Sequence, residues 1–251
     1  LIHFGTTFEK KLATKAPSLP ASAMQAPNTV KSEDECRKIL ASIGIPMANS
    51  EVAKSAKEAI SIWSAINGPV ALKIVSPDIL HKTEIGGVRL NLNDPTEIED
   101  AFNDIIEAGT KHYPKANIEG VIISEMISEG VETVLGVIND PIFGPAVMFG
   151  LGGVFVEVLG DVTFRLAPFD LSEAHRMIAE IKGIKMLYGA RGAASSDIDA
   201  IADALVKLSI FASTNSDKIS SIDINPFIVR PEGQGAVGVD ALIIPHGVDV
   251  I

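Results

Sequence analysis

Side chains able to hold a metal ion interrupt two apolar runs near the end of the chain. Asp223 and Asn225 alternate with isoleucines in IDINP, and Asp240 follows GAVGV. Successive side chains of a strand point to opposite faces, so Asp223 and Asn225 share a face that excludes Ile224. Carboxylate and amide oxygens suit Mg²⁺, which also keeps water and substrate phosphates in its coordination shell. Such residues alone are more often turn caps, but a phosphate-binding lysine elsewhere in the chain favours a metal site.

A lysine and a histidine lie together in an earlier stretch, GPVALKIVSPDILHKTEIGGVRL (68–90). Lys73 ends the apolar run Val70–Leu72, where it needs a partner because an unpaired buried ammonium is costly. That partner is either a carboxylate near the surface or a bound phosphate. His81 lies on a loop between the turn signals SPD and IGG, and an accessible imidazole there can act as a base or a nucleophile. The stretch therefore predicts phosphate chemistry.

A glycine-rich segment, FGLGGVFVE, precedes an arginine that suits a phosphate. Gly152 and Gly153 allow backbone N–H groups to approach phosphate oxygens. The segment is not a Walker A loop, since no Gly-Lys-Ser/Thr follows, and it lacks the GxGxxG dinucleotide fingerprint. Arg165 is a natural phosphate ligand, and it suits an ion pair with Glu157 or Asp161 equally well.

Helices and strands must hold these residues in place, and their boundaries are expected from caps and periodicity. Helices are expected to follow polar caps at Ser32, Ser55, Asp94, Asp170 and Ser196. Strands are expected over the apolar runs Val70–Val75, Val88–Leu92, Val121–Ile127, Val131–Ile138, Ala146–Phe149, Val154–Val158, Val162–Leu166, Ile219–Ile224 and Val237–Ile244. We expect the strand Val131–Ile138 to pair with Val121–Ile127.

The order of these elements is typical of an α/β (α+β) protein with two lobes. Residues 1–30 are rich in Lys, Ala, Ser and Pro and are expected to form a linker or arm. Residues 31–120 are expected to form a first lobe that carries Lys73 and His81. Residues 121–251 are expected to form a second lobe that carries the glycine-rich segment and the candidate metal ligands.

Composition excludes several classes of protein. The net charge of −11 argues against a nucleic-acid partner bound through phosphate contacts. The single cysteine, Cys36, excludes a disulfide framework within the chain and a cysteine-based metal site. No apolar run approaches the roughly 20 residues that cross a membrane, and nothing resembles a signal peptide. We expect a cytoplasmic protein, and because the chain begins at Leu1 rather than Met, we expect a fragment, a processed product or one domain of a longer polypeptide.

Four segments, in this order, resemble the ATP-grasp domain of the NDP-forming acyl-CoA synthetases: GPVALKIVSPDILHKTEIGGV, FGLGGVFVEVLGDVTFRLAP, GARG and IDINP. The resemblance runs from about Ser32 to Ile244. It is to the beta subunit of ADP-forming acetate–CoA ligases, or the equivalent domain of fused enzymes, and more distantly to the beta subunit of succinyl-CoA synthetase. It implies an ATP-grasp fold whose two α/β lobes hold the nucleotide between them. Ser221 and the alanines of GARGAASSD depart from the family pattern without removing an expected ligand.

The resemblance also implies roles for matching positions. His81 matches a loop histidine that carries phosphate between sites, and Asp223 an acid that steadies a phosphohistidine or helps to hold metal. Asn225 and Asp240 match the magnesium ligands. The positions that match nucleotide contacts are Lys73 at the phosphates, Glu125, Met126 and Ile127 at the base, Glu132 at the ribose, and Gly152, Gly153 and Arg165 in the hairpin over the phosphates.

The reaction implied by the resemblance is acyl-CoA + ADP + phosphate ⇌ carboxylate + CoA + ATP, through a phosphohistidine and with Mg²⁺. Such an acid–thiol ligase needs a CoA-binding or CoA-ligase subunit or domain, and we expect a hetero- or homo-oligomer. The alternative is a regulatory nucleotide- or acyl-CoA-sensing domain of a protein acetyltransferase, and a further rival is an ATP-grasp ligase that forms a free acylphosphate. The presence of Lys73, His81, Asn225 and Asp240 argues against a degenerate site.

Overall fold

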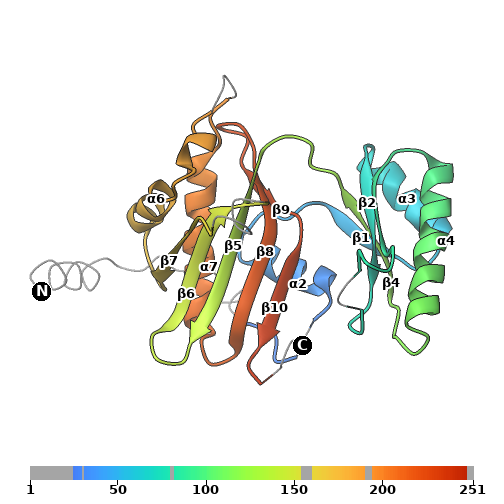
Figure 1. Cartoon of the computed structure of the whole chain (residues 1–251), viewed down its shortest axis with the longest axis horizontal. Helices are drawn as coiled ribbons and strands as arrows, with labels where there is room; N and C mark the ends of the chain where they lie inside the picture. Colours follow the sequence, from blue (N-terminus) through green and yellow to red (C-terminus); the bar gives the residue numbers. More distant parts are fainter. Residues whose placement is uncertain (1–24, 30, 80–81, 154–159, 190–193, 248–251) are drawn as a thin grey trace, which may run out of the picture. The chain divides into compact units, whose positions relative to one another are not determined.

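The computed structural model describes most of the chain: residues 25–29, 31–79, 82–153, 160–189 and 194–247. These residues form two compact units (Figure 1). Unit 1 contains Ile39–Pro46 and the described residues of Glu129–Ile251, together with 25–29; unit 2 contains 31–38 and the described residues of Met47–Ser128. The helix α2 (Glu33–Ser42) contributes its first residues to unit 2 and its last residues to unit 1.

Unit 2 is built on a four-stranded antiparallel sheet with the order β1–β4–β2–β3. The strands are β1 (Ser50–Ala53), β2 (Val70–Val75), β3 (Val88–Leu92) and β4 (Gly120–Glu125). Two helices, α3 (Ala56–Ile66) and α4 (Pro95–His112), lie side by side against one face of this sheet (Figure 1). Val70, Leu72 and Ile74 of β2 are buried in the core that this face forms with the helices.

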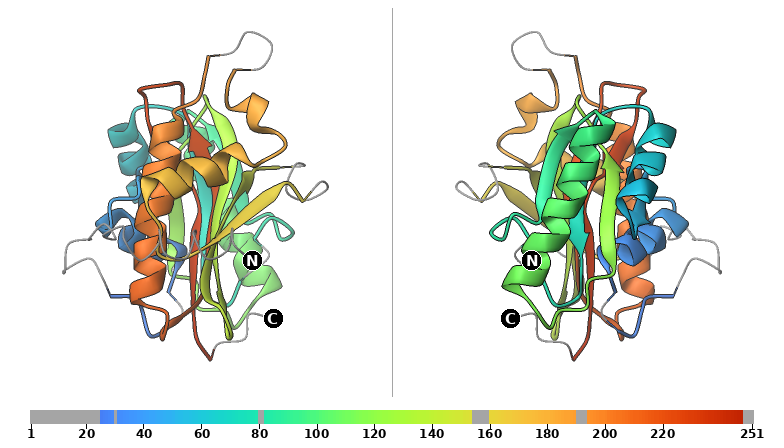
Figure 2. Two further views of the ribbon diagram at one scale, coloured as in Figure 1. Left: turned by 90° about the vertical axis from the view of Figure 1, so that its left-hand side faces the viewer. Right: turned by 90° about the vertical axis from the view of Figure 1, so that its right-hand side faces the viewer.

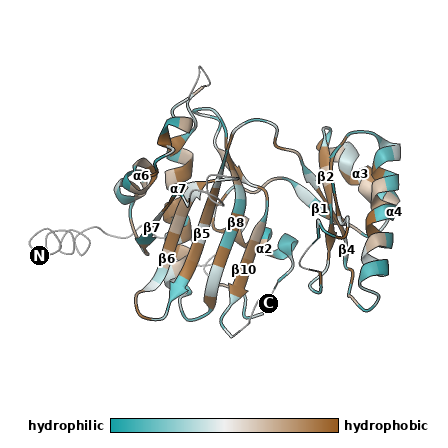
Figure 3. Cartoon of the chain, in the orientation of Figure 1, coloured by the Kyte–Doolittle hydropathy of each residue, from teal (hydrophilic) through white to brown (hydrophobic). Residues whose placement is uncertain are grey.

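Local capping explains where the helices of unit 2 begin. The Ser55 hydroxyl accepts a hydrogen bond from the Glu58 amide at 3.3 Å, and the Asp94 carboxylate accepts one from the Thr96 amide at 2.8 Å. Pro95 occupies the first turn of α4, where its missing N–H costs nothing. The outer side of α4 is hydrophilic (Figure 3), as expected for a helix that packs through one face. These helix starts confirm the sequence prediction.

Unit 1 is built on a six-stranded antiparallel sheet with the order β10–β8–β5–β6–β7, with β9 also paired to β8. Its strands are β5 (Val131–Asp140), β6 (Gly144–Leu151), β7 (Val162–Leu166), β8 (Ile219–Val229), β9 (Ala236–Gly238) and β10 (Ala241–Pro245). Its helices are α6 (Leu171–Ala179), the short 3₁₀ helix η2 (Ile184–Met186) and α7 (Ile198–Thr214).

Helices α6 and α7 cover one face of this sheet (Figure 2). The Thr163 hydroxyl of β7 donates to the Met177 carbonyl of α6 at 3.1 Å, which holds the helix against the strand. Directly paired residues of antiparallel strands share a face of the sheet. One such row crosses four strands on the helix-covered side, and all of its residues are buried: Val147, Val137, Ile222 and Ile243. The apolar residues of each strand therefore form the core with the helices.

Four expected features differ in the structure. The expected strand Val237–Ile244 is two strands, β9 and β10, separated by Val239 and Asp240. The strand β5 pairs with β6 and β8, not with β4, which instead lies between β1 and β2 in unit 2. The strand expected at the start of the second lobe therefore belongs to the sheet of unit 2. Lys73 lies inside β2 and does not end it. The cap of α7 is Asp197, whose carboxylate accepts from the Ala200 amide at 3.1 Å, while the neighbouring Ser196 is buried.

The expected strand Val154–Val158, His81, and the expected linker up to residue 24 lie outside the described residues. Within the described part of the chain, none of the helices combines the length and the apolar character needed to span a membrane.

The core of unit 2 yields a stability prediction. Leu72→Ala removes a side chain that is 0 % exposed between the sheet and its helices, and we expect it to lower the free energy of unfolding by about 2–5 kcal/mol. Leu90→Ala on the adjacent β3 serves as the control because Leu90 is 56 % exposed, and we expect a change within about 0.5 kcal/mol. Urea denaturation measures both, and equal losses would contradict the burial of Leu72.

Candidate functional site

The three expected metal-binding side chains are brought together by β8 and β10. Asp223 and Asn225 are exposed on β8, while the intervening Ile224 is buried. In the register of the two strands Leu242 faces Asp223 and Ala241 faces Ile224, so Asp240 is next to Asn225. The backbone N–H of Asn225 donates a hydrogen bond to the backbone carbonyl of Asp240 at 3.2 Å, which holds the two positions together. The alternation predicted from IDINP is confirmed, and it leaves the side chains of Asp223 and Asn225 on the face that the described helices do not cover.

The electrostatic environment of Asp223 differs from that of an ordinary surface acid. Desolvation by the surrounding protein raises the pKa of its carboxyl above the usual value. A carboxylate held where its charge is disfavoured lowers stability, and that arrangement is typical of sites that await a cation or a proton.

The donor set fits a magnesium ion. Asp240 supplies a carboxylate and Asn225 an amide oxygen, and a second carboxylate, Asp223, lies on the same strand face. Within the described residues there is no group of three or more His, Cys, Asp and Glu side chains arranged for a metal. A site with few protein ligands is typical of Mg²⁺ bound together with substrate phosphates.

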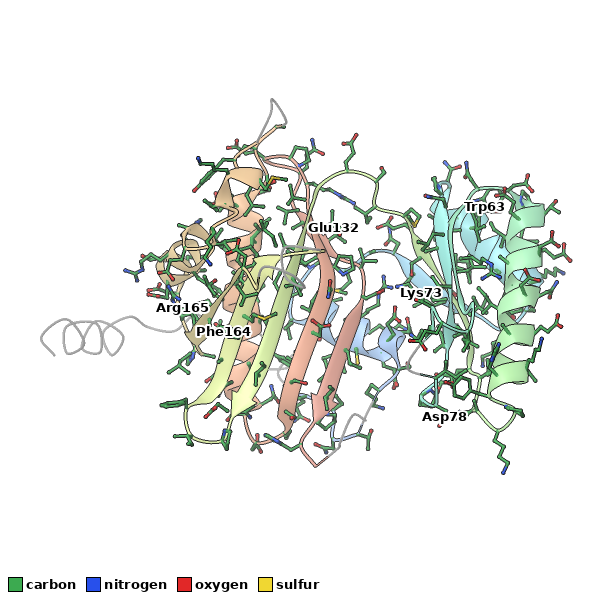
Figure 4. The ribbon with its side chains drawn as sticks, viewed as in Figure 1. Trp63, Lys73, Asp78, Glu132, Phe164 and Arg165 are labelled. Atoms are coloured by element: carbon green, nitrogen blue, oxygen red, sulfur yellow. The ribbon has the colours of Figure 1, made fainter. Side chains whose placement is uncertain are left out.

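Two further expected contacts, Glu132 and Gly152, also lie together in unit 1. The Gly152 amide donates to the Glu132 carbonyl at 2.7 Å, and a Cβ at Gly152 would lie only 3.0 Å from the Glu132 Cβ. The close approach therefore favours glycine at this position, because a larger residue would have to displace Glu132 by a few tenths of an ångström. Glu132 is exposed at the beginning of β5 (Figure 4), and Gly153 has a φ of +61°, which also favours glycine.

Arg165 is not brought to the face that carries Asp223. Its Nε donates to Glu173 and its Nη2 to Glu180, both at 2.6 Å, and the two carboxylates belong to α6 and the residue after it. Arg165 follows Phe164 on β7 (Figure 4). The strand register places Phe164 on the same face of the sheet as Asp223, so Arg165 lies on the opposite face, which the helices cover. Among the described residues the ion pairs of Arg165 are with Glu173 and Glu180 and not with Asp161, while Glu157 lies outside the described residues.

In unit 2, Lys73 has the carboxylate partner that its position in a strand demands. Its Nζ lies 3.8 Å from Oε1 of Glu33, the first residue of α2. The same carboxylate accepts a hydrogen bond from Lys82 Nζ at 2.7 Å. Lys73 points away from the core residues Leu72 and Ile74, because alternate residues of β2 face opposite sides.

The residues expected to line a nucleotide base lie at and after the end of β4. Asn49 holds the Glu125 carboxylate through its backbone amide at 3.0 Å and its Nδ2 at 3.1 Å, and its carbonyl accepts from the Glu125 amide at 3.0 Å. The Met126 amide donates to the Pro69 carbonyl at 2.9 Å, and Met126 and Ile127 are half-buried. These bonds fix the backbone of the segment.

The sequence did not reveal Glu33, Lys82 or Asn49 as parts of these arrangements. Glu33 begins a helix, which is a sufficient reason for an acid at that position. Lys82 directly follows His81 in the sequence, and a second basic residue beside a candidate phosphate carrier is the signal that could have identified it.

The raised pKa of Asp223 predicts a change in stability with pH. The folded protein favours the protonated carboxyl, so the cost of the carboxylate appears as the pH rises past its unfolded pKa. Asp223→Asn should therefore raise the melting temperature at pH 7, in the absence of Mg²⁺ and nucleotide, and the gain should vanish at acidic pH. Thermal unfolding from pH 3 to pH 8 measures it, with Asp217→Asn as an exposed control. A lower melting temperature of Asp223→Asn than of the wild type at pH 7 would contradict the desolvation of this carboxylate.

The ion pairs of Arg165 predict the opposite dependence at Glu173. Burial raises the pKa of this carboxyl, but hydrogen bonds and charges from Arg165 and Arg176 outweigh it and lower the pKa overall. The stabilisation is therefore present at neutral pH and lost as the pH falls through the lowered pKa. We expect Glu173→Gln to cost about 1.5–3 kcal/mol of unfolding free energy at pH 7.

The neighbouring Glu180 is the control for this prediction because it bonds the same arginine but is 55 % exposed. Glu180→Gln should cost less than about 1 kcal/mol. Denaturant titrations at pH 7 and at acidic pH separate the two variants, and a Glu173→Gln loss that persisted in acid would contradict the ion-pair explanation.

Comparison with known proteins gives the family. The family model described as "ATP-grasp domain" matches residues 22–244. The chain is 44 % identical over 219 residues to subunit beta of acetate–CoA ligase [ADP-forming] II of Pyrococcus furiosus, and the match covers 87 % of this chain and 93 % of that subunit.

Solved structures agree in fold over the same share of the chain. Acetyl-coenzyme A synthetase 1 of Ca. Korarchaeum cryptofilum, in complex with coenzyme A and Ca-AMPCP, is 44 % identical with a TM-score of 0.82, over 87 % of this chain and 94 % of that one. Another structure of that enzyme, with Mg-AMPPCP and its phosphohistidine segment pointing towards the nucleotide binding site, is 40 % identical with a TM-score of 0.76, over 87 % and 93 %. The chain belongs to the ATP-grasp family, in the group formed by beta subunits of ADP-forming acetate–CoA ligases.

Proposed function

We propose that this chain is the nucleotide-binding, phosphate-transferring part of an ADP-forming acyl-CoA synthetase. The reaction is acyl-CoA + ADP + phosphate ⇌ carboxylate + CoA + ATP. The acyl group passes from CoA to phosphate, the phosphoryl group then passes to a histidine, and ADP finally takes it from that histidine. This chain binds the nucleotide and serves the last of these transfers.

The observation that carries this proposal is the arrangement of Asp223 and Asn225 on one face of β8, with Asp240 beside Asn225 just before β10 begins. Polar side chains are ordinary on a strand face that the helices leave uncovered, so the feature that singles out this group is the desolvation that raises the pKa of Asp223. The family match over most of the chain supports a nucleotide-linked metal as the ligand that we propose for these residues.

Each group of residues has a distinct task in the proposed mechanism. Lys73 offsets charge on the nucleotide phosphates, which lowers the repulsion that an incoming phosphoryl group meets. The segment Glu125–Ile127, with its backbone fixed through Asn49, binds the base, and Glu132 binds the ribose. Gly152 and Gly153 allow the backbone to approach the phosphates. The Glu173 and Glu180 ion pairs of Arg165 give it a structural role, so it is not assigned a phosphate.

Asn225 and Asp240 would hold Mg²⁺, with Asp223 beside them. When bound, this ion supplies positive charge that stabilises the phosphate oxygens. Asp223 gains most from such a neighbour, because a cation offsets the desolvation of its carboxylate.

The partner is a CoA-binding subunit or domain, since the matched relative is by name one subunit of a larger enzyme. That partner carries out the steps on the acyl group. The assembled enzyme is an oligomer. It is located in the cytoplasm, where ADP, ATP and CoA are available together.

The test separates nucleotide binding from phosphate transfer. Lys73→Met should weaken ADP binding about tenfold or more, because a charge-assisted hydrogen bond contributes about 1.5–3 kcal/mol. His81→Ala should leave ADP affinity near that of the wild type and abolish ATP formation by the enzyme assembled with its CoA-binding partner. Isothermal titration and a coupled ATP assay measure the two quantities.

Lys57→Met is the matched control, since Lys57 is an exposed lysine on α3 of the same unit. It should change neither quantity. An assembled wild-type enzyme that bound ADP but formed no ATP from acyl-CoA would contradict the proposal and favour the regulatory sensing domain.

A further inference from the structure

One carboxylate in unit 2 gathers three basic side chains. Glu33 Oε2 accepts a hydrogen bond from Lys82 Nζ at 2.7 Å, and Glu33 Oε1 lies 3.8 Å from Lys73 Nζ and 3.9 Å from Arg37 Nη1. The Glu33 side chain is 12 % exposed, and those of Lys73 and Lys82 are 12 % and 21 % exposed. Groups this far out of water are expensive to bring together unless they have a function or a tight geometry.

Arg37 fixes the first turns of α2 on the sheet of unit 2. Its Nη1 donates to the Ser124 hydroxyl of β4 at 3.1 Å, and its Nη2 donates to the Ala48 carbonyl at 2.6 Å. Its side chain is 3 % exposed. Ser124 pairs with Ala71 of β2, two residues before Lys73, so this anchor explains why Glu33 reaches the Lys73 side of the sheet.

Lys82 is held by its backbone as well as by its ammonium. The Gly87 amide donates to the Lys82 carbonyl at 2.8 Å, and the Gly87 carbonyl accepts from the Ile74 amide at 2.8 Å. A Cβ at Gly87 would lie 2.8 Å from both the Lys82 carbonyl and Ile74 Cγ2, so glycine is required for this approach. The turn therefore fixes Lys82 beside the residue that follows Lys73 on β2.

We propose that Lys82 is a second phosphate-binding lysine of the nucleotide site, and that Glu33 is its positioning residue. The inference rests on the proposed function, because the ligand is the terminal phosphate of a nucleoside di- or triphosphate at Lys73. Glu33 offsets the repulsion between two ammonium groups before the phosphate arrives. An ammonium has three donors, and among the described residues the hydrogen bond of Lys82 goes to Glu33, so it can also contact a phosphate oxygen.

The chemistry of the proposal predicts discrimination between nucleotides. A lysine at the terminal phosphate contributes to the binding of ADP and not to that of AMP, which lacks that phosphate. A lysine that only stabilises the fold affects both nucleotides alike. The ratio of AMP to ADP dissociation constants therefore reports the contact directly.

The experiment measures ADP and AMP binding by titration calorimetry in the enzyme assembled with its CoA-binding partner. Lys82→Met should raise the dissociation constant for ADP about tenfold and leave that for AMP within about twofold of the wild-type value. Lys82→Arg, which keeps the charge, should recover most of the ADP affinity. Lys38→Met is the control, because Lys38 also forms an ion pair with an acid of α2, Asp34, but is 73 % exposed. It should leave both constants unchanged.

The role of Glu33 is tested by coupling. Glu33→Gln should partly lower the ratio of the AMP to the ADP dissociation constant. Adding Glu33→Gln to Lys82→Met should lower this ratio no further, since Glu33 acts through Lys82. Equal losses with and without Lys82 would overturn the positioning role.

Failure of this inference is distinct from failure of the proposed function. If the wild type and Lys38→Met bind ADP and form ATP while Lys82→Met keeps the same AMP to ADP ratio, the second lysine is wrong and the function stands. If Lys82→Met weakens both nucleotides together with the melting temperature, its role is structural and the inference is overturned. If the wild type itself binds no ADP, the proposed function fails.

Discussion

In the described part of unit 1 the helices cover one face of the sheet, and this arrangement imposes the constraint on which the unit depends. Each strand must direct its apolar residues to the helices, and its alternate residues are then released from core packing. On β8 this places Ile222 and Ile224 in the core and leaves Asp223 and Asn225 available for a ligand. Core residues and candidate ligands therefore alternate along one strand. A shift of its pairing register by one residue would turn the isoleucines out of the core and the candidate ligands into it.

Much of the local structure could be predicted from the sequence because its causes are local. A serine or aspartate before an apolar-periodic run is enough to place a helix start, as at Ser55 and Asp94. Strand pairing is different, because it depends on residues far away in the chain. Nothing near β5 shows that its partners are β6 and β8 and not the preceding strand β4, so the expected pairing was wrong.

The site was predictable to a similar extent. Alternation within five residues predicted the common face of Asp223 and Asn225, and the strand register brings Asp240 beside them. The partners of the cations were not predictable, since an ion pair is chosen by tertiary packing. Arg165 reaches Glu173 because α6 folds back over β7, and Lys73 reaches Glu33 because Arg37 anchors α2 on the sheet. The family resemblance supplied roles for single residues, but not these pairings.

The separation of the two faces of β8 also affects how a protein of this kind can change over generations. Residues that hold the fold and the residues that we propose as ligand contacts are neighbours in the sequence but do not touch the same surroundings. If Asp223 and Asn225 have the roles proposed above, their substitution after a gene duplication would abolish the activity while the duplicated copy still folded. Such a copy would persist in the cell long enough to acquire a different task, so loss of activity here need not mean loss of the protein.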